Sequence, residues 1–271
     1  MIMKNDAKNS ISMERVQKDL KLSIGDYGHA SLNAGVTTIF SILFPPFAPI
    51  FSAVFGTVIL PPPISKRLND LLFDIVKGLN ELKQMHENFE IEDLAQNESF
   101  LTTLIHAYEL AIRTHQKEKL EALRNAVLNS ALPTAPEDDI KIIFLNLIES
   151  FTVTHIKLLK FFNERRSKYW IDNLTSKIDY NFDFAGYSFR DDVSVKVMTF
   201  EFGDVMATTF PDYIEKNMLY QYALKDLDSQ GMVIRDPGDT TFRVIPIDGH
   251  SDPQVQPFGK QFMEFIESPL K

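Results

Sequence analysis

Histidine is the residue type in this sequence best suited to acid–base or metal chemistry, and the chain has six of them. His115 stands one helical turn before Glu118, and His155 follows Thr154 where a helix is expected to begin. Neither histidine matches the HExxH motif or any three-ligand zinc spacing. We therefore expect these histidines to cap helices or to lie on the surface, and we expect no metal site.

Adjacent carboxylates are the other groups that could bind a cation. Asp138-Asp139 stands at an expected helix start and Asp191-Asp192 in an expected turn, where acidic side chains are usually solvated. The sequence has no GxGxxG, P-loop or GxSxG motif, and its lack of cysteine excludes thiolate ligands and a cysteine nucleophile. The sequence predicts no catalytic residue and no cofactor, so we expect a protein that is not an enzyme.

Two asparagines spaced four residues apart interrupt a segment with an otherwise core-facing pattern. Asn125 and Asn129 follow Arg124 within EKLEALRNAVLNSAL. Side chains at this spacing share one helix face, and a buried polar contact there can fix how the helix packs on its neighbour. We expect Arg124, Asn125 and Asn129 to set helix register, with ligand binding as the alternative.

The largest departure from an ordinary soluble domain is a run of 39 residues, Tyr27 to Ser65, without Asp, Glu, Lys or Arg. Its centre, residues 34–60, is almost wholly apolar and exceeds the length of about 18 residues that indicates a membrane span. Bulky residues recur there at helical spacing, each followed by a small residue or a proline, a pattern that favours helix packing within lipid. The bulky set is Phe40, Phe44, Phe47, Phe51 and Phe55, and the small set includes Ser41, Ala48, Ser52 and Gly56.

Three prolines in the same run, Pro45, Pro46 and Pro49, prevent a straight helix because each lacks a backbone donor and clashes with the preceding turn. A kinked helix of roughly 26 residues would still rise about 39 Å and cross a hydrocarbon core of about 30 Å. Two separate halves would be too short, and would instead form a re-entrant hairpin or a hairpin buried inside an oligomer. Membrane contact and a protein-covered hairpin both stay open at this point.

Periodic apolar residues predict helices through the middle of the chain. We expect helices over residues 65–89, from Asn97 to about 110, over 118–132, from a capping box at Thr134 to Phe151, and from about 152 to 162. Residues 167–195 mix aromatic residues with turn formers and allow no firm assignment. The expected fold class is mainly α, with residues 1–62 as an N-terminal segment and residues 63–151 as a multi-helix body.

Residues 152–271 have the element order of a winged-helix-like α+β module, with an insertion at about 164–200. A helix from Pro211 to Leu227, ending at Gly231, precedes an expected hairpin of residues 232–234 and 241–245 and a final helix over 258–266. DNA readers bring Lys and Arg to phosphates and bases, yet residues 164–271 hold 12 Lys and Arg against 18 Asp and Glu. Because the whole chain also has a net charge of −9, the sequence argues against nucleic acid as a partner and favours protein interaction or dimerisation.

Three segments carry a resemblance to known proteins. EKLEALRNAVLNSAL, KIIFLNLIESFTVTHIKLLKFF and the terminal FGKQFMEFI are similar to a widespread, poorly characterised group of bacterial helical proteins. They also resemble, more loosely, the Abi-alpha proteins associated with abortive infection and phage defence. The likeness covers residues 60–163 and, loosely, 211–267. It implies a helical fold and a defence context, and it supplies no catalytic residue.

These features predict a non-enzymatic bacterial antiviral defence effector or accessory protein that acts at the inner membrane through its apolar segment. One alternative is a soluble scaffold that uses the segment as a subunit interface, and another is a winged-helix transcriptional regulator. We expect a homo-oligomer or a protein partner. The expected location is the cytoplasm or the inner membrane, with peripheral or integral attachment.

Overall fold

The computed structural model describes residues 60–164, 167–185, 195–234, 241–244, 251–252 and 254–270. These residues are mainly helical, as predicted, and they belong to two compact units. Unit 1 holds the described residues up to Leu145 together with the end of the chain, and unit 2 is Asn146–Glu267. The expected Phe40–Phe55 and Ser41–Gly56 stripes lie outside the described residues.

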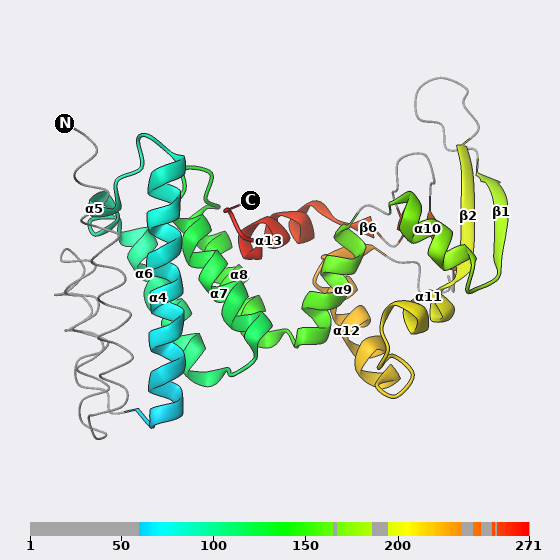
Figure 1. Ribbon diagram of the computed structural model, residues 1–271, viewed down its shortest axis with the longest axis horizontal. Helices are drawn as coiled ribbons and strands as arrows, with labels where there is room; N and C mark the ends of the chain where they lie inside the picture. The colour runs from blue at the N-terminus through cyan, green and yellow to red at the C-terminus, as the bar shows by residue number, and fades with distance from the viewer. Residues whose placement is uncertain are drawn as a thin grey trace. The chain divides into compact units, whose positions relative to one another are not determined.

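Unit 1 is built from helices that follow one another in the chain. They are α4 (Pro62–Met85), the short α5 (Ile91–Leu94), α6 (Glu98–Arg113), α7 (Lys117–Ser130) and the start of α8 (Asp138–Ser150). Figure 1 shows α4, α6 and α7 side by side, and each of the three contacts the other two. Their facing sides are apolar, and Leu68, Leu82, Phe100, Leu123 and Phe144 are fully buried in this core.

The longest helix among the described residues, α4, begins three residues earlier than expected, at Pro62. Proline suits the first turn of a helix because the backbone N–H that it lacks would have no partner there. Further along α4, Arg67 donates from Nη2 to the carbonyls of Ala111 and Ile112, at 3.2 and 3.0 Å, in the last turn of α6. A guanidinium at this end satisfies unpaired carbonyls and complements the negative end of the helix dipole.

Asn97 and Thr134 give opposite outcomes for the predicted helix starts. Asn97 caps α6 as predicted, because its side-chain oxygen accepts the N–H of Phe100 at 3.0 Å. The prediction of a capping box at Thr134 is wrong, since α8 begins at Asp138. Thr134 lies in a turn closed by the bond from the N–H of Ala135 to the carbonyl of Leu132, which holds it outside the helix.

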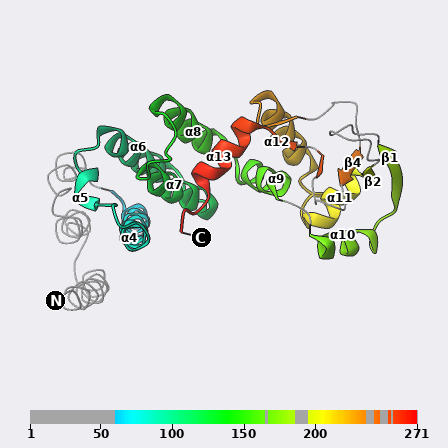
Figure 2. The same cartoon turned by 90° about the horizontal axis from the view of Figure 1, so that it is seen from above.

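Unit 2 combines short helices with strands. Its elements are α9 (Val153–Asn163), α10 (Lys168–Thr175), β1 (Tyr180–Ala185), β2 (Val195–Glu201), α11 (Phe202–Thr209), α12 (Asn217–Ser229), β3 (Val233–Ile234), β4 (Thr241–Val244), β5 (Ser251–Asp252), β6 (Gln254–Val255) and α13 (Pro257–Ile266). One antiparallel sheet has the order β1-β2-β4-β5, and a second sheet pairs β3 with β6. Figure 2 shows β1, β2 and β4 next to one another beside α11, which contacts β2 and β4.

An aromatic cluster forms the centre of unit 2. Phe161 of α9 lies with ring centroids 5.4 to 6.3 Å from those of Trp170, Phe210 and Phe242, and Phe202 lies 6.4 Å from Phe242. Aromatic rings at these separations add edge and offset contacts to the apolar area that they bury. The cluster joins α9, α10 and α11 to β4.

The C-terminal elements depart from the expected hairpin. Among the described residues, β3 pairs with β6, whereas β4 pairs with β2 and β5. The carbonyl of Met232, just before β3, accepts the N–H of Gln256 at 2.8 Å. Gly259 in α13 then packs directly on that same carbonyl, where a Cβ atom would collide with it. β6 therefore takes the place of the strand that the sequence predicts as the partner of β3.

The helix expected from Pro211 starts later and ends as predicted. Residues 211–216 form a turn in which the N–H of Lys216 bonds to the carbonyl of Asp212 at 2.9 Å, and α12 follows from Asn217. Gly231 has φ 68°, and the N–H groups of Gly231 and Met232 bond to the carbonyls of Asp228 and Leu227. This is a Schellman motif with glycine at the left-handed position.

In the described part of the chain, no single helix has the length and apolar character needed to cross a bilayer. One bent pair, α8 with α9, meets the requirement by length and composition alone.

Candidate functional site

A polar cluster joins the first turns of α6 and α8 in unit 1. Ser99 of α6 donates from Oγ to Oδ1 of Asp138 at 2.6 Å, and Nζ of Lys141 lies 2.8 Å from that same carboxylate oxygen. Lys141 also donates to the Ser99 hydroxyl oxygen. Lys141 is only 5% exposed, so its charge is buried beside the carboxylate of Asp138, with which it forms an ion pair.

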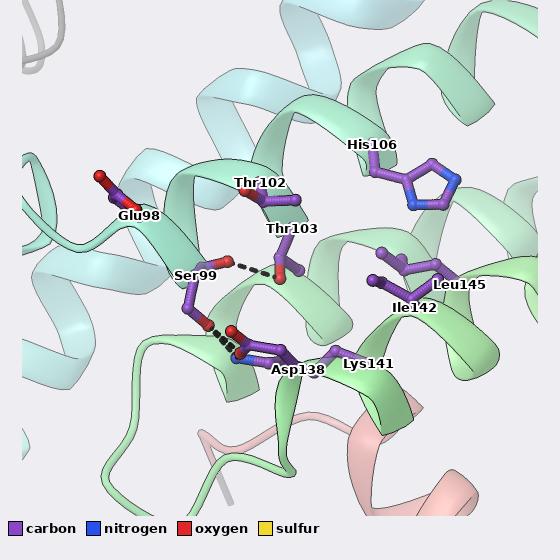
Figure 3. A pocket seen from close by; sticks show the side chains of 9 residues that line it. All are labelled: Glu98, Ser99, Thr102, Thr103, His106, Asp138, Lys141, Ile142 and Leu145. Atoms are coloured by element: carbon purple, nitrogen blue, oxygen red, sulfur yellow. Dashed lines mark hydrogen bonds and ion pairs between the residues drawn. The ribbon is translucent and has the colours of Figure 1, made fainter.

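The cluster forms one wall of a cavity of about 180 Å³, which Figure 3 shows from close by. The cavity lies between α6 and α8 and is lined by Glu98, Ser99, Thr102, Thr103, His106, Asp138, Lys141, Ile142 and Leu145. Cofactors and drug-sized ligands usually occupy about 300–1,000 Å³. The cavity therefore has room for an ion or a very small molecule.

Charge and hydrogen bonds decide what this cluster can do chemically. The hydrogen bonds from Lys141 and then Ser99, together with the positive charge of Lys141, lower the pKa of Asp138. An ammonium group paired with a carboxylate has no lone pair with which to activate a serine hydroxyl. The hydroxyl proton of Ser99 already points to Asp138. The arrangement joins two helix starts and offers hydrogen bonds to a small polar group.

Sequence reasoning found only part of this cluster. It singled out Asp138-Asp139 and expected solvated side chains, and both residues are exposed even though Asp138 is paired. Lys141 was readable in principle, because a residue three positions after Asp138 shares its helix face. Ser99 had no local signal, since the contact joins positions 39 residues apart.

A second polar constellation lies inside unit 2 at His155, which is 1% exposed. Its Nδ1 accepts the backbone N–H of Thr152 at 3.0 Å, as predicted for a capping histidine, and its Nε2 lies 3.1 Å from Oδ2 of Asp226 in α12. An Nδ1 that accepts an N–H carries no proton, so the proton is on Nε2, which donates a hydrogen bond to Oδ2 of Asp226. Both ring nitrogens are bonded, which leaves the imidazole as a link between α9 and α12.

Two rings fix the plane of the same imidazole. Phe151 stacks on His155 with centroids 4.8 Å apart, and Tyr222 of α12 meets it edge-on at 6.0 Å. Phe151 in turn packs edge-on against Phe262 of α13 at 5.8 Å. The link between α9 and α12 is therefore held by packing as well as by hydrogen bonds.

The remaining predicted site residues fall in different places. Asn125 is buried, and its side-chain oxygen accepts a bond from Nη1 of Arg124 at 2.9 Å, while Nε of Arg124 donates to the carbonyl of Asp74 in α4 at 3.3 Å. Asn129 lies one turn later on α7. The contact with α4 suits the expected role of Arg124, Asn125 and Asn129 in helix register, which stays a prediction.

Metal ligation has no support in the described ranges, where no group of three or more His, Asp or Glu side chains is arranged to hold an ion. His115 and Glu118 are both exposed. The Asp191-Asp192 pair lies outside the described residues.

The outer face of α12 is the most unusual surface in the described structure. Met218 is 87% exposed, Tyr222 is 63% exposed, and Ile214 in the preceding turn is 77% exposed. Two charges of this region are internally paired, because Lys216 binds Asp212 at 2.8 Å. Clustered exposed apolar residues with a polar surround typically mark interaction sites, so this face is the better candidate for function.

Comparison of the chain with protein-family models, curated proteins and solved structures finds no match.

Proposed function

We propose that this protein is a non-enzymatic bacterial defence effector or accessory protein that works by association. In this proposal the apolar segment around residues 37–56 attaches the chain to the inner membrane, and unit 2 binds protein. The exposed apolar face of α12 is the observation that carries the binding role. The uncharged run of 39 residues supports the membrane role, and the resemblance to Abi-alpha proteins supports the defence context.

In this proposal unit 2 is a winged-helix-like module that binds protein and does not bind DNA. Its chain order supports the winged-helix-like assignment when α10 and β1 are taken as an insertion, because α9 is then followed by β2, α11, α12, β3 and β4, and β2 pairs with β4. The second helix of such a motif normally brings cations to the major groove. On α12 the outward positions include the uncharged Met218 and Tyr222, and the exposed Lys225 is followed by the acidic Asp226 and Asp228. Lys216, just before α12, is paired with Asp212.

Membrane attachment is tested by fractionating cells that express the full chain, followed by carbonate and detergent extraction. A Phe51→Glu variant places a charge in the apolar segment, at a cost of about 2.5–3.5 kcal/mol if that position lies in lipid. We expect the wild-type chain in the membrane fraction and the variant shifted to the soluble fraction. Met85→Glu, at an exposed position outside the segment, is the matched control. A wholly soluble, monomeric wild-type chain would overturn the membrane role.

A soluble scaffold is the second candidate, and the Ser52-x-x-x-Gly56 spacing favours it because small residues allow close helix packing. Replacing Ser52 and Gly56 by Leu separates the candidates. A soluble assembly held by this face should dissociate in light scattering without any lipid present, whereas membrane attachment should persist in the larger, more apolar variant.

A further inference from the structure

Four exposed residues along α12 and its preceding turn form a stripe with a distinct order of chemistry. Glu215 comes first, Met218 and Tyr222 follow, and Lys225 ends the stripe, at spacings of three, four and three residues. Met218, Tyr222 and Lys225 share one face of α12 at these spacings, and Glu215 lies in the turn that leads into the helix. The stripe is therefore acidic at its N-terminal end, apolar in its middle and basic at its C-terminal end.

We propose that this stripe binds the same stripe of a second copy of the chain, with the two α12 helices antiparallel. The proposal rests on the proposed function, in which unit 2 acts by association, and it names the partner. In a two-fold arrangement centred at the level of Tyr220, residues equally far before and after that level face each other. Met218 of one copy then meets Tyr222 of the other, and Glu215 meets Lys225, each contact occurring twice.

Charge complementarity is the reason for choosing a second copy as the occupant. Glu215 and Lys225 have no ion-pair partner within the described part of the chain. A parallel copy would place Glu215 opposite Glu215 and Lys225 opposite Lys225, whereas the antiparallel copy places Glu215 opposite Lys225 twice. DNA bound at this face would bring its phosphates close to the carboxylates of Glu215 and Asp228, and these like charges repel each other.

The middle of the stripe suits a helix-to-helix contact. Met218 is a flexible side chain whose sulfur packs well on an aromatic ring, and Tyr222 offers that ring. The inner edge of Tyr222 is already braced by His155, with centroids 6.0 Å apart. Because this contact already restricts the Tyr222 ring, the side chain loses little conformational entropy when it binds a partner.

Cysteine cross-linking in the full chain tests the arrangement, because the natural sequence has no cysteine to give background. Two single variants, Met218→Cys and Tyr222→Cys, carry different tags and are mixed before mild oxidation. We expect the mixed disulfide to form at least about fivefold faster than either homodimer disulfide, since only facing positions bring the sulfurs together. Tyr169→Cys, at another exposed aromatic position of unit 2, measures random collision.

Charge reversal gives an independent test on the same full-length protein. Glu215→Lys and Lys225→Glu should each lower the α12 cross-link yield about tenfold, because each places like charges together at both ends. The double variant should return the yield to near the wild-type level. Failure of this rescue, a cross-link no faster than Tyr169→Cys, or a dominant Met218-to-Met218 disulfide would overturn the antiparallel dimer. Fractionation reports membrane attachment separately, so its result is unaffected by any of these outcomes.

Discussion

His155 donates a hydrogen bond from Nε2 to the carboxylate of Asp226 across 3.1 Å, and this bond joins the first turn of α9 to α12. The other ring nitrogen caps the same first turn through the N–H of Thr152. One imidazole therefore completes a helix start and anchors the helix that carries the exposed apolar face.

Replacing His155 by Ala should destabilise unit 2 by about 2–3 kcal/mol, because the N–H of Thr152 and the carboxylate of Asp226 both lose a partner. Urea unfolding followed by circular dichroism measures the change. His115→Ala, at an exposed position, should stay within about 0.5 kcal/mol of wild type. A His155→Ala protein with unchanged stability would show that the link contributes nothing.

Gly259→Ala should destabilise the protein by about 1–3 kcal/mol, since its Cβ would collide with the backbone carbonyl of Met232, which cannot move aside like a flexible side chain. Gly203→Ala is the matched control in α11, where a Cβ meets nothing within 4 Å. The control should gain about 0.5–1 kcal/mol from helix propensity. Thermal or urea unfolding distinguishes the two, and equal effects would contradict the close approach of α13 to Met232.

The two charges of the α6–α8 cluster should respond unequally to removal. Asp138→Asn leaves the buried ammonium of Lys141 without a balancing charge, which is strongly unfavourable. Lys141→Met removes the buried charge and keeps the apolar stem, so it should be nearly neutral or slightly stabilising. We expect Asp138→Asn to unfold at lower urea than Lys141→Met, and the reverse order would rule out a buried, compensated Lys141.

Asp212 should show an unusual acid titration. Hydrogen bonds from Lys216 and then Tyr220 lower its pKa from 3.8 to about 2. A carboxylate with a lowered folded-state pKa adds stability that is present above pH 3.8 and is lost as the pH falls towards 2. Tyr220→Phe removes one donor and should raise the pKa of Asp212, as measured by carbon NMR of the carboxylate. An unchanged pKa in that variant would show that the phenol has no part in the shift.

Much of the fold was readable from sequence where a local rule governs the structure. Local sequence determines the cap at Asn97 and the helix end at Gly231, because both depend on residues within a few positions. The apolar repeats of α4, α6 and α7 are likewise local. Elements set by distant contacts were missed. α11 follows β2 with no residue between them, and the pairing of β3 with β6 joins positions about twenty residues apart.

In the candidate sites too, contacts between near neighbours in the sequence could be predicted and contacts between distant residues could not. Capping by His155 could be predicted because Thr152 is three residues away, whereas its bond to Asp226 joins positions 71 residues apart. The exposed face of α12 was missed because Met218 and Tyr222 look like core positions in a periodic pattern. Only the packing of Tyr220, Ala223 and Leu227 into the core shows which side of α12 faces outward.

The pairing of β3 with β6 has a consequence for synthesis on the ribosome. α4, α6 and α7 contact near neighbours in the chain, so they can assemble as soon as Ser130 has emerged. Unit 2 must wait at least until α13 has emerged, because β6 and α13 follow all of its other elements in the chain. Translation therefore lets α4, α6 and α7 pack together while the partner strand of β3 is still to be made, so β3 remains unpaired at that stage.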